Sequence, residues 1–522
     1  MRLDVRRAAP TLIAGAIALA YVVISPPSYD LAAHLFRAKL FSAEGFGLWN
    51  NWWYGGHHTL GYSVLFPPLA AALTPQLVGA VATTVTAALF EPLAHREFGE
   101  RSWLGACWFG AGTAVDLFSG RLTFAFGLMF AVAAVLALQR GRAPSAAALS
   151  ALAALSSPVA ALFTALVGAA YGLGGYLAKR ERRDPVIGVG MIGASLLPVL
   201  ALAVAFPEGG TEPYALSALL PLPVIGVLAV VLFPRRELPL KLGIAMYTVG
   251  CVASYAIPSP IGSNVGRLGT LLAGPLAALF WWRRRTLWLL VAVIPLLYLQ
   301  WQAPIRDLTT SEDNATVFAA YWRPLIGFLD RQDGPPFRIE IPFTSFHWEA
   351  YWVAPHFPLA RGWERQLDIK DNHLFYAGRL TAASYHAWLR RLAVRFVALT
   401  DTAPDVSARQ EVRMIDRGLP YLRLVFRTTS FRVYAVRDAL PIVQGPATLT
   451  ALGPNSLTLR ARRAGRLLLR VRFTPYWKLG EGSGCVAPDG DFTRLTLRRP
   501  GPAKLVVDFS LARIGSRAPR CT

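Results

Sequence analysis

The chain has 522 residues, of which 54% are hydrophobic and 16% charged, and its mean hydropathy is +0.39. This balance excludes an ordinary soluble globular protein and indicates an integral membrane protein. The formal net charge of +22 would suggest nucleic acid binding in a soluble chain. In a membrane protein, Arg and Lys accumulate in cytoplasmic loops instead, so we expect no nucleic acid partner.

Apolar segments recur from the N-terminus to residue 303, with lengths close to the ~20 residues that cross a bilayer. Eleven spans are predicted, at 8–25, 69–93, 102–118, 121–138, 144–156, 158–178, 186–206, 214–233, 239–257, 264–282 and 286–303. The first follows the charged start MRLDVRRAAP, as in a secretory signal, but no convincing cleavage site follows it. We therefore expect a retained signal anchor.

Basic residues alternate between the predicted loops. The loops on the N-terminal side carry Arg2, Arg6, Arg7, Arg96, Arg101, Arg140, Arg142, Lys179, Arg180, Arg182, Arg183, Arg235, Arg236, Lys241 and Arg283 to Arg285. The opposite loops carry only Arg37, Lys39, Arg121 and Arg267, together with Glu208 and Glu212. Because cytoplasmic loops are rich in Arg and Lys, the N-terminus is predicted to be cytoplasmic, and the 26–68 loop and everything after residue 304 extracytoplasmic.

Residues 26–68 are too polar, too aromatic and too rich in Gly and Pro to cross the membrane, so we expect a long first external loop. Its opening places Asp30, His34 and Arg37 at i, i+4 and i+7, which share a face if Ser28 caps a helix there. Aromatic and imidazole side chains suited to the membrane interface, or to stacking on sugar rings, follow at Trp49, Trp52, Trp53, Tyr54, His57 and His58.

Ionisable residues at membrane depth usually serve a function, because charge is costly to bury in a bilayer. Asp30 has a simpler alternative, since a carboxylate in a first helical turn stabilises the helix dipole. Asp116 and Arg121, in the short loop DLFSGRL, can bind a ligand or close a helical hairpin by a salt bridge. Asn264 and Arg267 enter the tenth predicted span, where the guanidinium needs an ion pair or an anion such as a lipid phosphate.

From about residue 305 charged residues become frequent and no further span is predicted, so we place the transmembrane domain at 1–304. Residues 305–440 read as an external α+β region. It has a helix in TVFAAYWRPLIGFLDRQ, a strand in FRIEIPF, a helix and a strand in YHAWLRRLAVRFVALTD, and two strands in RLVFRTTSFRVYAV. Residues 441–522 read as a small external β-sandwich with one Arg-rich wet face.

One segment of the soluble region is dense in aromatic and charged side chains, as in a carbohydrate-binding surface or in a seam that docks on the membrane part. It contains His347, Trp348, Glu349, Trp352, Arg361, Trp363, Glu364, Arg365 and Asp368. Of the four cysteines, Cys107 and Cys251 lie in apolar spans, whereas Cys485 and Cys521 can pair outside the cytoplasm or stay unrelated thiols. No metal-ligand spacing, Walker motif, HExxH or GxSxG elbow is present, which argues against an ATP-driven pump and the common hydrolases.

A first span, a long external loop that begins with an acidic residue, many further spans and an external C-terminal region together resemble the GT-C class of membrane glycosyltransferases. Protein O-mannosyltransferases, aminoarabinose transferases and actinobacterial arabinofuranosyltransferases belong to this class, which uses polyprenyl-phosphate sugars. The order of Asp30, His34 and Arg37, then tryptophans, a Gly-Gly pair and a Pro-Pro turn, also looks like bacterial membrane proteins named after a pyruvoyl-tetrahydropterin-synthase relationship. The resemblance covers the membrane half, and the C-terminal half matches only in being external.

The resemblance implies an inverting transfer of a sugar from a polyprenyl-phosphate donor to an extracytoplasmic glycan, lipid or protein acceptor. Asp30 would be the base, and the donor phosphate would meet Arg267, Asn264, Arg37 and Arg121. The aromatic residues of the loop, with His34 and Asp116, would hold the sugars, and Arg361, Trp363, Glu364 and Arg365 would supply external contacts.

Many members of the class carry a second acidic residue beside the first, but Tyr29 and Leu31 flank Asp30 here. Glu44 or Asp116 can substitute for it, and a divalent cation is compatible with the reaction rather than required by it. The Arg- and Ala-rich composition hints at an actinobacterial cell envelope and so at arabinose or mannose donors.

Two other classes stay open as alternatives. A transporter or flippase of lipid-linked saccharides usually has repeated halves around a midplane site, and we detect no internal repeat in the sequence. In a non-catalytic scaffold or sugar-binding protein, Asp30 and Arg267 would not converge, and substituting either would leave function intact.

Overall fold

The computed structural model describes residues 5–179, 183–234, 237–311 and 314–522. The basic residues Arg2, Arg180, Arg182, Arg235 and Arg236, used above to orient the chain, lie outside these ranges. The chain divides into two compact units. We call Met1–His34, Gly61–Ala203 and Gly209–Glu312 the helical unit, and Leu35–Leu60, Val204–Glu208 and Asp313–Thr522 the αβ unit.

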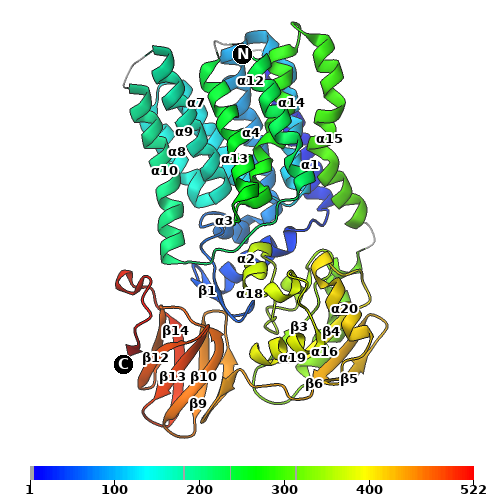
Figure 1. Ribbon diagram of the computed structural model, residues 1–522, viewed down its shortest axis with the longest axis vertical. Coiled ribbons are helices and arrows are strands. Elements are labelled where there is room, and N and C mark those ends of the chain that lie inside the picture. The colour runs from blue at the N-terminus through cyan, green and yellow to red at the C-terminus, as the bar shows by residue number, and fades with distance from the viewer. Residues whose placement is uncertain (1–4, 180–182, 235–236, 312–313) are drawn as a thin grey trace. The chain divides into compact units, whose positions relative to one another are not determined.

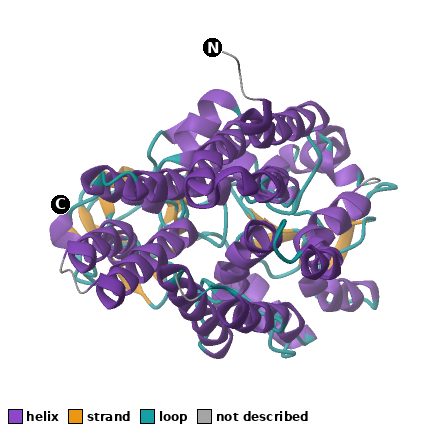
Figure 2. Cartoon of the chain, turned by 90° about the horizontal axis from the view of Figure 1, so that it is seen from above, coloured by secondary structure: helices purple, strands orange, loops and turns teal. Residues whose placement is uncertain are grey.

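The helical unit consists of helices joined mostly by short connections (Figures 1 and 2). They are α1 (Val5–Ile24), α3 (Phe66–Leu73), α4 (Pro75–Phe98), α5 (Ser102–Gly112), α6 (Ala114–Phe118), α7 (Leu122–Gln139), α8 (Ala143–Ser156), α9 (Pro158–Lys179), α10 (Arg183–Ala205), α11 (Leu216–Leu219), α12 (Pro221–Leu232), α13 (Leu238–Ala256), α14 (Gly266–Trp281) and α15 (Thr286–Ser311). Each of the eleven predicted spans coincides with one of these helices or with two consecutive ones.

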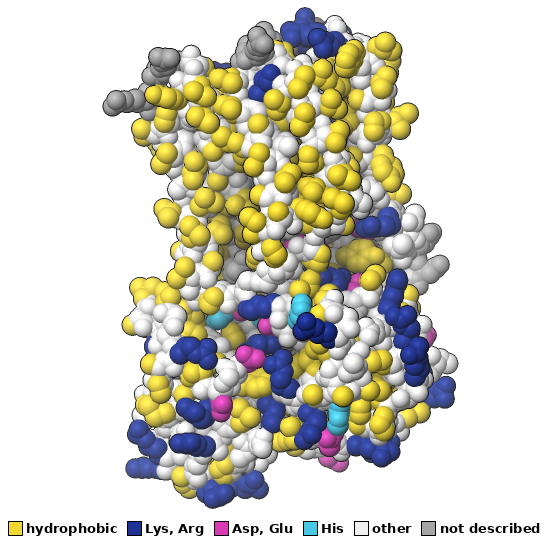
Figure 3. Space-filling model, in the orientation of Figure 1, with side chains coloured by type: hydrophobic (Ala, Val, Ile, Leu, Met, Phe, Trp, Pro, Cys, Tyr) yellow, Lys and Arg dark blue, Asp and Glu magenta, His cyan; other side chains and the backbone are white. Residues whose placement is uncertain are grey.

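Seven helical segments of the described chain are long and apolar enough to cross a membrane, and Ala143–Ser156 and Leu216–Leu232 are shorter apolar helices. The core of the unit surrounds α7, which packs against α4, α8 and α9. Outer helices such as α13 and α15 instead leave Val249, Val291 and Ile294 exposed, as lipid-facing side chains would be. Hydrophobic side chains cover much of the face of this unit in Figure 3. The chain is therefore a multi-pass membrane protein.

Short connections reverse the chain direction between consecutive long helices, so the helix ends alternate between the two ends of the unit. The C-terminal end of α1, the α6–α7 turn, the start of α14 and the end of α15 fall at one end. The connections that follow α4, α7 and α14, and the one that precedes α10, fall at the other end. The first of these ends carries Asp30, Arg121 and Arg267.

The αβ unit contains a four-stranded sheet in the order β3-β4-β6-β5 (Figure 1). Its strands are β3 (Arg338–Glu340), β4 (Val394–Thr400), β5 (Leu422–Arg427) and β6 (Phe431–Val436), and its helices are α16 (Ala319–Asp330), α17 (Glu349–Trp352), α18 (Arg365–Asp371), α19 (Ala382–Arg391) and α20 (Arg409–Asp416). β3 runs parallel to β4, and the other pairs are antiparallel. The helices and strands predicted for 305–440 are confirmed at these positions.

The C-terminal strands form two further sheets, in the orders β15-β12-β13-β10-β7 and β11-β14-β9-β8. They are β7 (Val443–Gln444), β8 (Ala447–Leu452), β9 (Ser456–Ala461), β10 (Gly465–Arg472), β11 (Trp477–Glu481), β12 (Gly484–Asp489), β13 (Phe492–Leu497), β14 (Gly501–Val507) and β15 (Arg520–Cys521). Alternate side chains such as Leu457, Leu469, Leu495 and Leu505 fill one core between the sheets, as expected of a β-sandwich. A disulfide joins Cys485 to Cys521, so this pairing considered from the sequence is present.

Much of the 26–68 loop belongs to the αβ unit. Helix α2 (Leu31–Glu44) begins in the helical unit and continues in the αβ unit, and β1 (Trp49–Asn50) pairs with β2 (His57–His58). The predicted boundary at residue 304 placed all of residues 1–304 in one domain. The contacts instead group residues 35–60 and 204–208 with residues 313–522.

Candidate functional site

Asp30 stands immediately before helix α2, at the N-cap position. Its backbone carbonyl accepts a hydrogen bond from the backbone N–H of His34 at 3.2 Å, which begins the helical pattern. The predicted cap by Ser28 is wrong, because the helix starts at Leu31. Among the described residues, the buried hydroxyl of Ser28 has no hydrogen-bond partner, and it lies where Gly120 approaches the loop.

A turn between α6 and α7 closes against this helix start. His34 Nε2 lies 2.8 Å from the carbonyl oxygen of Gly120, and since a carbonyl only accepts, the ring nitrogen donates. Gly120 has φ +70°, and a Cβ there would lie 2.3 Å from Ser28 Oγ and 3.3 Å from Asp30 Cβ. Only glycine fits this close approach, and it places the next residue, Arg121, beside the start of α2.

Arg121 is the centre of a cluster of charges within the helical unit. Burial lowers the pKa of its guanidinium, and the positive charge of Arg267 lowers it further. The carboxylates of Asp116, Asp30 and Asp307 act in the opposite direction. Because the ordinary pKa of arginine lies far above neutrality, Arg121 stays charged among three acidic groups and a second guanidinium. The structure thus brings together Asp30, Asp116, Arg121 and Arg267 from three separate stretches of sequence.

The other members of the cluster are held by their own helices. Asp116 is 4% exposed on α6, and its backbone carbonyl accepts from the N–H of Arg121 at 2.8 Å, which closes the turn. Arg267 lies in the first turn of α14, donates to Asn264 Oδ1 and sits over the ring of Phe124, 5.3 Å from its centroid. Asn264 is therefore a partner that orients Arg267.

Sequence reasoning missed Asp307. It lies near the C-terminal end of α15, is 5% exposed, and forms an ion pair with Arg306 at 3.1 Å. The last predicted span stopped at residue 303, but the helix continues to Ser311. One sequence signal could have identified Asp307, because it is a carboxylate about one turn beyond the last predicted span, on the same side as Asp30.

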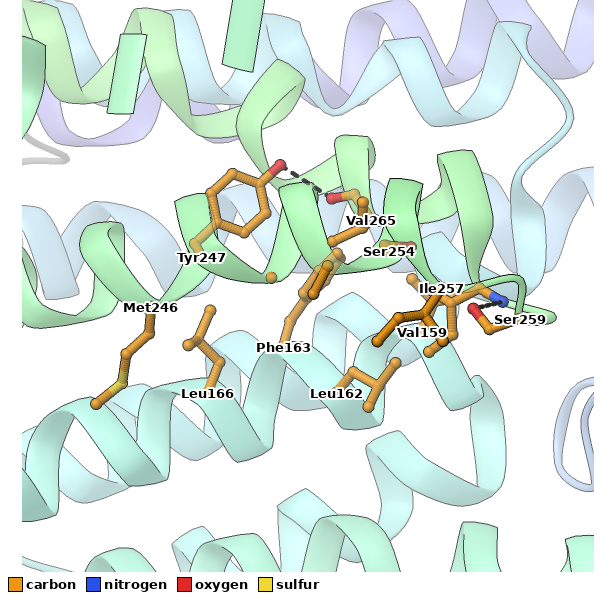
Figure 4. Close-up of a pocket in the computed structure, with 13 residues that line it drawn as sticks. Val159, Leu162, Phe163, Leu166, Met246, Tyr247, Ser254, Ile257, Ser259 and Val265 are labelled. Atoms are coloured by element: carbon orange, nitrogen blue, oxygen red, sulfur yellow. Dashed lines mark hydrogen bonds between the residues drawn. The ribbon is translucent and has the colours of Figure 1, made fainter. Parts of the chain in front are cut away.

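An apolar cavity of about 360 Å³ lies between α9 and α13, with Ile257 and Ser259 among the lining residues at one end (Figure 4). The side chains that line it include Leu162, Phe163, Met246 and Tyr247, and the Tyr247 hydroxyl donates to the carbonyl oxygen of Val265 at 2.9 Å. Phe163 packs edge-on against Phe124, the ring under Arg267. Phe163 thus both lines the apolar cavity and contacts Phe124, the ring under the Arg267 guanidinium.

Arg37 lies on α2, about two turns after Asp30. It belongs to the αβ unit, where its guanidinium contacts Glu364 at 2.5 Å and both side chains are about nine-tenths buried. This ion pair is one contact of Arg37 within the αβ unit, and the role of Arg37 as a phosphate ligand stays a prediction.

The aromatic side chains of the first loop pack inside the αβ unit instead of lying open for a sugar. Trp49 belongs to the sandwich core, Trp53 stacks on Phe36 at 4.0 Å between ring centroids, and the Tyr54 hydroxyl donates to the Gly362 carbonyl oxygen at 2.5 Å. Trp52 is the partly exposed member of the group. The density of aromatic residues reflects a core formed by distant segments, which the sequence does not reveal.

The two histidines of the hairpin are also held internally. His57 Nε2 lies 3.0 Å from Asn50 Nδ2, and His58 contacts Glu208 at 2.8 Å and Thr474 Oγ1 at 3.0 Å. Burial favours a raised pKa for Glu208, but hydrogen bonds from His58 hold that pKa below its usual value. His58 and Glu208 therefore form a buried polar pair.

The segment from His347 to Asp368 forms a buried polar network in the αβ unit. Arg361 is 1% exposed, contacts Asp368 at 2.6 Å and Glu411 at 3.4 Å, and lies between the rings of Phe343 and Phe375. Trp363 stacks on His347. The interpretation of this segment as an exposed carbohydrate surface is therefore wrong for Arg361 and Trp363, which are internal.

Arg365 and Glu364 complete the segment. Arg365 binds Asp405 with two hydrogen bonds at 3.0 and 2.9 Å. Together, His347 and Arg365 keep the pKa of Asp405 below its ordinary value although burial opposes them. Glu364 pairs with Arg37 of the first loop. The segment thus packs on residues of the 26–68 loop inside the same unit.

Among the described residues, no group of three or more His, Cys, Asp or Glu side chains is arranged to hold a metal ion. The cluster around Arg121 instead places two guanidiniums among its carboxylates. These cations can meet an anionic ligand.

No family model matches the sequence, and no curated protein sequence matches it significantly. Among solved structures, the chain is similar to the oligosaccharyltransferase AglB of the archaeon Archaeoglobus fulgidus in complex with an inhibitory peptide and a dolichol-phosphate. That similarity has 11% identity and a TM-score of 0.45, over 76% of this chain and 69% of AglB. The apo form of the oligosaccharyltransferase gives 12% identity and a TM-score of 0.44 over the same shares.

The chain is also similar to the arabinofuranosyltransferase AftD from Mycobacteria, with 13% identity and a TM-score of 0.48. This similarity covers 97% of the present chain and 57% of AftD. At this level the three similarities carry no argument about activity. The structure itself shows a multi-pass membrane protein whose helical unit has a charge cluster around Arg121 at one end.

Proposed function

We propose that this protein transfers a sugar from a polyprenyl-phosphate donor to an extracytoplasmic glycan, lipid or protein acceptor. The observation that carries the proposal is that the turn preceding Arg121 lies against the start of α2, where a Cβ on Gly120 would be 3.3 Å from Asp30 Cβ, while Asp30 and Arg267 both act electrostatically on Arg121. A charge cluster of this kind beside apolar spans is suited to an amphiphilic anion. The proposal includes a cytoplasmic N-terminus and an extracytoplasmic αβ unit.

In the proposed reaction, an acceptor hydroxyl oxygen forms a bond to the anomeric carbon of the donor while the bond from that carbon to the phosphate oxygen breaks. The hydroxyl proton passes to the Asp30 carboxylate, and the bonding electrons leave with the polyprenyl phosphate. Polyprenyl phosphate is a good leaving group, so one general base is sufficient. Attack from the face opposite to the phosphate gives inversion at the anomeric carbon.

Arg267 and Arg121 have the complementary role. Negative charge grows on the departing phosphate oxygen, and guanidiniums in a partly desolvated site stabilise that charge more strongly than water does. Asn264 orients Arg267 by accepting its hydrogen bond. Asp116 and Asp307 balance the two cations when no phosphate is bound, because their carboxylates favour the charged form of Arg121.

The apolar cavity between α9 and α13 supports a lipid-linked donor. Its lining is made of aliphatic and aromatic side chains, and Phe163 of that lining packs on the ring beneath Arg267. An isoprenoid chain placed in this cavity would leave its phosphate near the start of α14. The proposed donor therefore requires both features, an apolar cavity and a cationic end, in one unit.

The test uses the full chain in lipid nanodiscs with radiolabelled decaprenyl-phosphate arabinose and mannose, and with oligosaccharide acceptors. The proposal expects labelled product and free decaprenyl phosphate in equal amounts. Donor that binds without turnover would support the scaffold alternative instead. Donor that crosses a proteoliposome bilayer unchanged would support the flippase alternative. Either of these two results would overturn the transferase proposal.

A further inference from the structure

Six exposed arginines gather at one end of the β-sandwich. Three lie in or beside the β9–β10 turn, two in the β13–β14 turn and one near the end of β9: Arg462, Arg463, Arg466, Arg498, Arg499 and Arg460. The pairing register brings the two turns together, because Gly465 pairs with Leu497 in one sheet and Ala461 pairs with Gly501 in the other. Both turns therefore cross between the sheets at the same end, which we call the arginine end.

The arginine end has little internal compensation of charge. No Asp or Glu occurs in residues 445–466 or 496–503. Within the described chain, none of the six arginines lies within 4.0 Å of an Asp or Glu carboxylate, and Arg498 contacts the backbone oxygen of Thr522 at 3.3 Å. Glu481, at the end of β11, pairs in register with Lys504. Six like charges held this closely repel one another and lower stability unless an anion joins them.

The chemistry of the arginine end favours a charged polymer over a membrane surface. Surfaces that bind membranes combine basic residues with apolar side chains that enter the lipid. The described residues 445–503 contribute no exposed large hydrophobic side chain. Without exposed aromatic rings, the end also lacks the stacking surfaces that hold neutral sugars or single-stranded bases.

We infer that the arginine end of the β-sandwich binds a phosphodiester-linked polyol polymer. A guanidinium matches two phosphate oxygens with parallel hydrogen bonds, and a row of arginines on two adjacent turns matches phosphates that repeat along a chain. This surface is separate from the charge cluster of the helical unit. It is tested by binding alone and does not depend on transferase activity.

The probe is fluorescent poly(glycerol phosphate), added to the full chain in nanodiscs of neutral phosphatidylcholine. The arginine-end variant carries Arg462→Gln, Arg463→Gln, Arg466→Gln and Arg499→Gln. The matched control removes the same charge from exposed, scattered arginines of the αβ unit through Arg379→Gln, Arg409→Gln, Arg423→Gln and Arg427→Gln. Thermal unfolding of both variants confirms that they fold.

We expect the wild-type chain to bind the probe, and the binding to weaken as salt is raised from about 50 to about 200 mM. The arginine-end variant should bind about tenfold more weakly, because four ion pairs are lost together, while the control changes by less than about twofold. Equal weakening in both variants would overturn the inference in favour of general charge attraction. Stronger binding to phosphatidylglycerol vesicles, to single-stranded DNA or to neutral dextran than to the probe would also overturn it.

Discussion

His34 Nε2 donates a hydrogen bond to the carbonyl oxygen of Gly120 at 2.8 Å. The bond fastens the first turn of α2 to the turn that carries Arg121, and it lies within one compact unit. The ring of His34 is 1% exposed and packs against Tyr62 and Phe66. Asp30 and Arg121 are thus held in place by a buried, directional contact.

Replacing His34 should disturb the site without removing any charge from it. His34→Phe keeps the packed ring but leaves the Gly120 carbonyl without its donor, and a buried polar group left unpaired costs about 1–3 kcal/mol. We expect kcat for sugar transfer to fall about tenfold with a small change in KM. His34→Gln, which can still donate, should recover part of the loss. Full activity in His34→Phe would contradict a positioning role.

Gly120 allows a close approach that a methyl group would block. Gly120→Ala adds a Cβ at a left-handed φ of +70°, only 2.3 Å from Ser28 Oγ. Gly141 has a similar φ of +72° but nothing within 4 Å, so Gly141→Ala carries the same backbone strain without the clash. We expect Gly120→Ala to lower the thermal midpoint more than Gly141→Ala does, and to reduce turnover alone. Equal effects of the two substitutions would show that only the backbone conformation matters.

Arg267 should stabilise the departing phosphate. Arg267→Ala is expected to lower kcat about 10²-fold to 10³-fold, the usual cost of removing one group that stabilises charge in the transition state. Arg267→Lys should recover only part of the lost kcat, because an ammonium cannot donate two parallel hydrogen bonds to phosphate as the planar guanidinium does. Arg284→Ala, which removes an exposed guanidinium from the connection after α14, is the matched control and should act like the wild type. Comparable losses in Arg267→Ala and Arg284→Ala would exclude a specific phosphate contact.

The buried network of the αβ unit predicts a pH dependence of stability. Burial raises the pKa of Glu411 from 4.5 to about 7, although Arg361 and Tyr385 oppose the shift. The folded chain therefore holds a proton that the unfolded chain releases between pH 4.5 and about 7. Raising the pH through this window should lower the free energy of unfolding, and the raised pKa of Glu340 acts in the same direction.

Glu411→Gln isolates this effect, because the amide stays neutral at every pH. We expect its thermal midpoint to fall less between pH 4.5 and 7 than the wild-type midpoint does. The measurement is the unfolding midpoint of the full chain by tryptophan fluorescence at several pH values. Parallel curves for the two proteins would show that Glu411 does not carry the dependence.

The apolar segments and the alternating strands were predictable because they follow from local patterns. A run such as residues 286–303 can satisfy its backbone in a bilayer only as a helix, and the alternation in SLTLRA places Leu457 and Leu459 on one face. The same local reasoning stopped the last span about two turns too early and missed Asp307.

Interactions between distant segments were not predictable from the sequence. The rings of Trp49 and Trp53 look like an exposed platform in sequence, yet their partners Trp477 and Phe36 make them core residues. Helical spacing grouped Arg37 with Asp30 but gave no sign of its ion pair with Glu364, a carboxylate more than 300 residues away. Gly120, which positions Arg121, carries no signal in one sequence because its need for close approach arises only after folding.

The proposal depends most directly on the carboxylate of Asp30. Asp30→Asn keeps the size and the N-cap oxygen of the side chain but removes the base, so we expect turnover of polyprenyl-phosphate donor to fall at least about 10²-fold, with donor binding preserved. Glu100→Gln, which removes an exposed carboxylate from the connection between α4 and α5, is the control and should retain activity. Loss of turnover in Asp30→Asn alone is the predicted result. Unchanged turnover in Asp30→Asn would contradict the account.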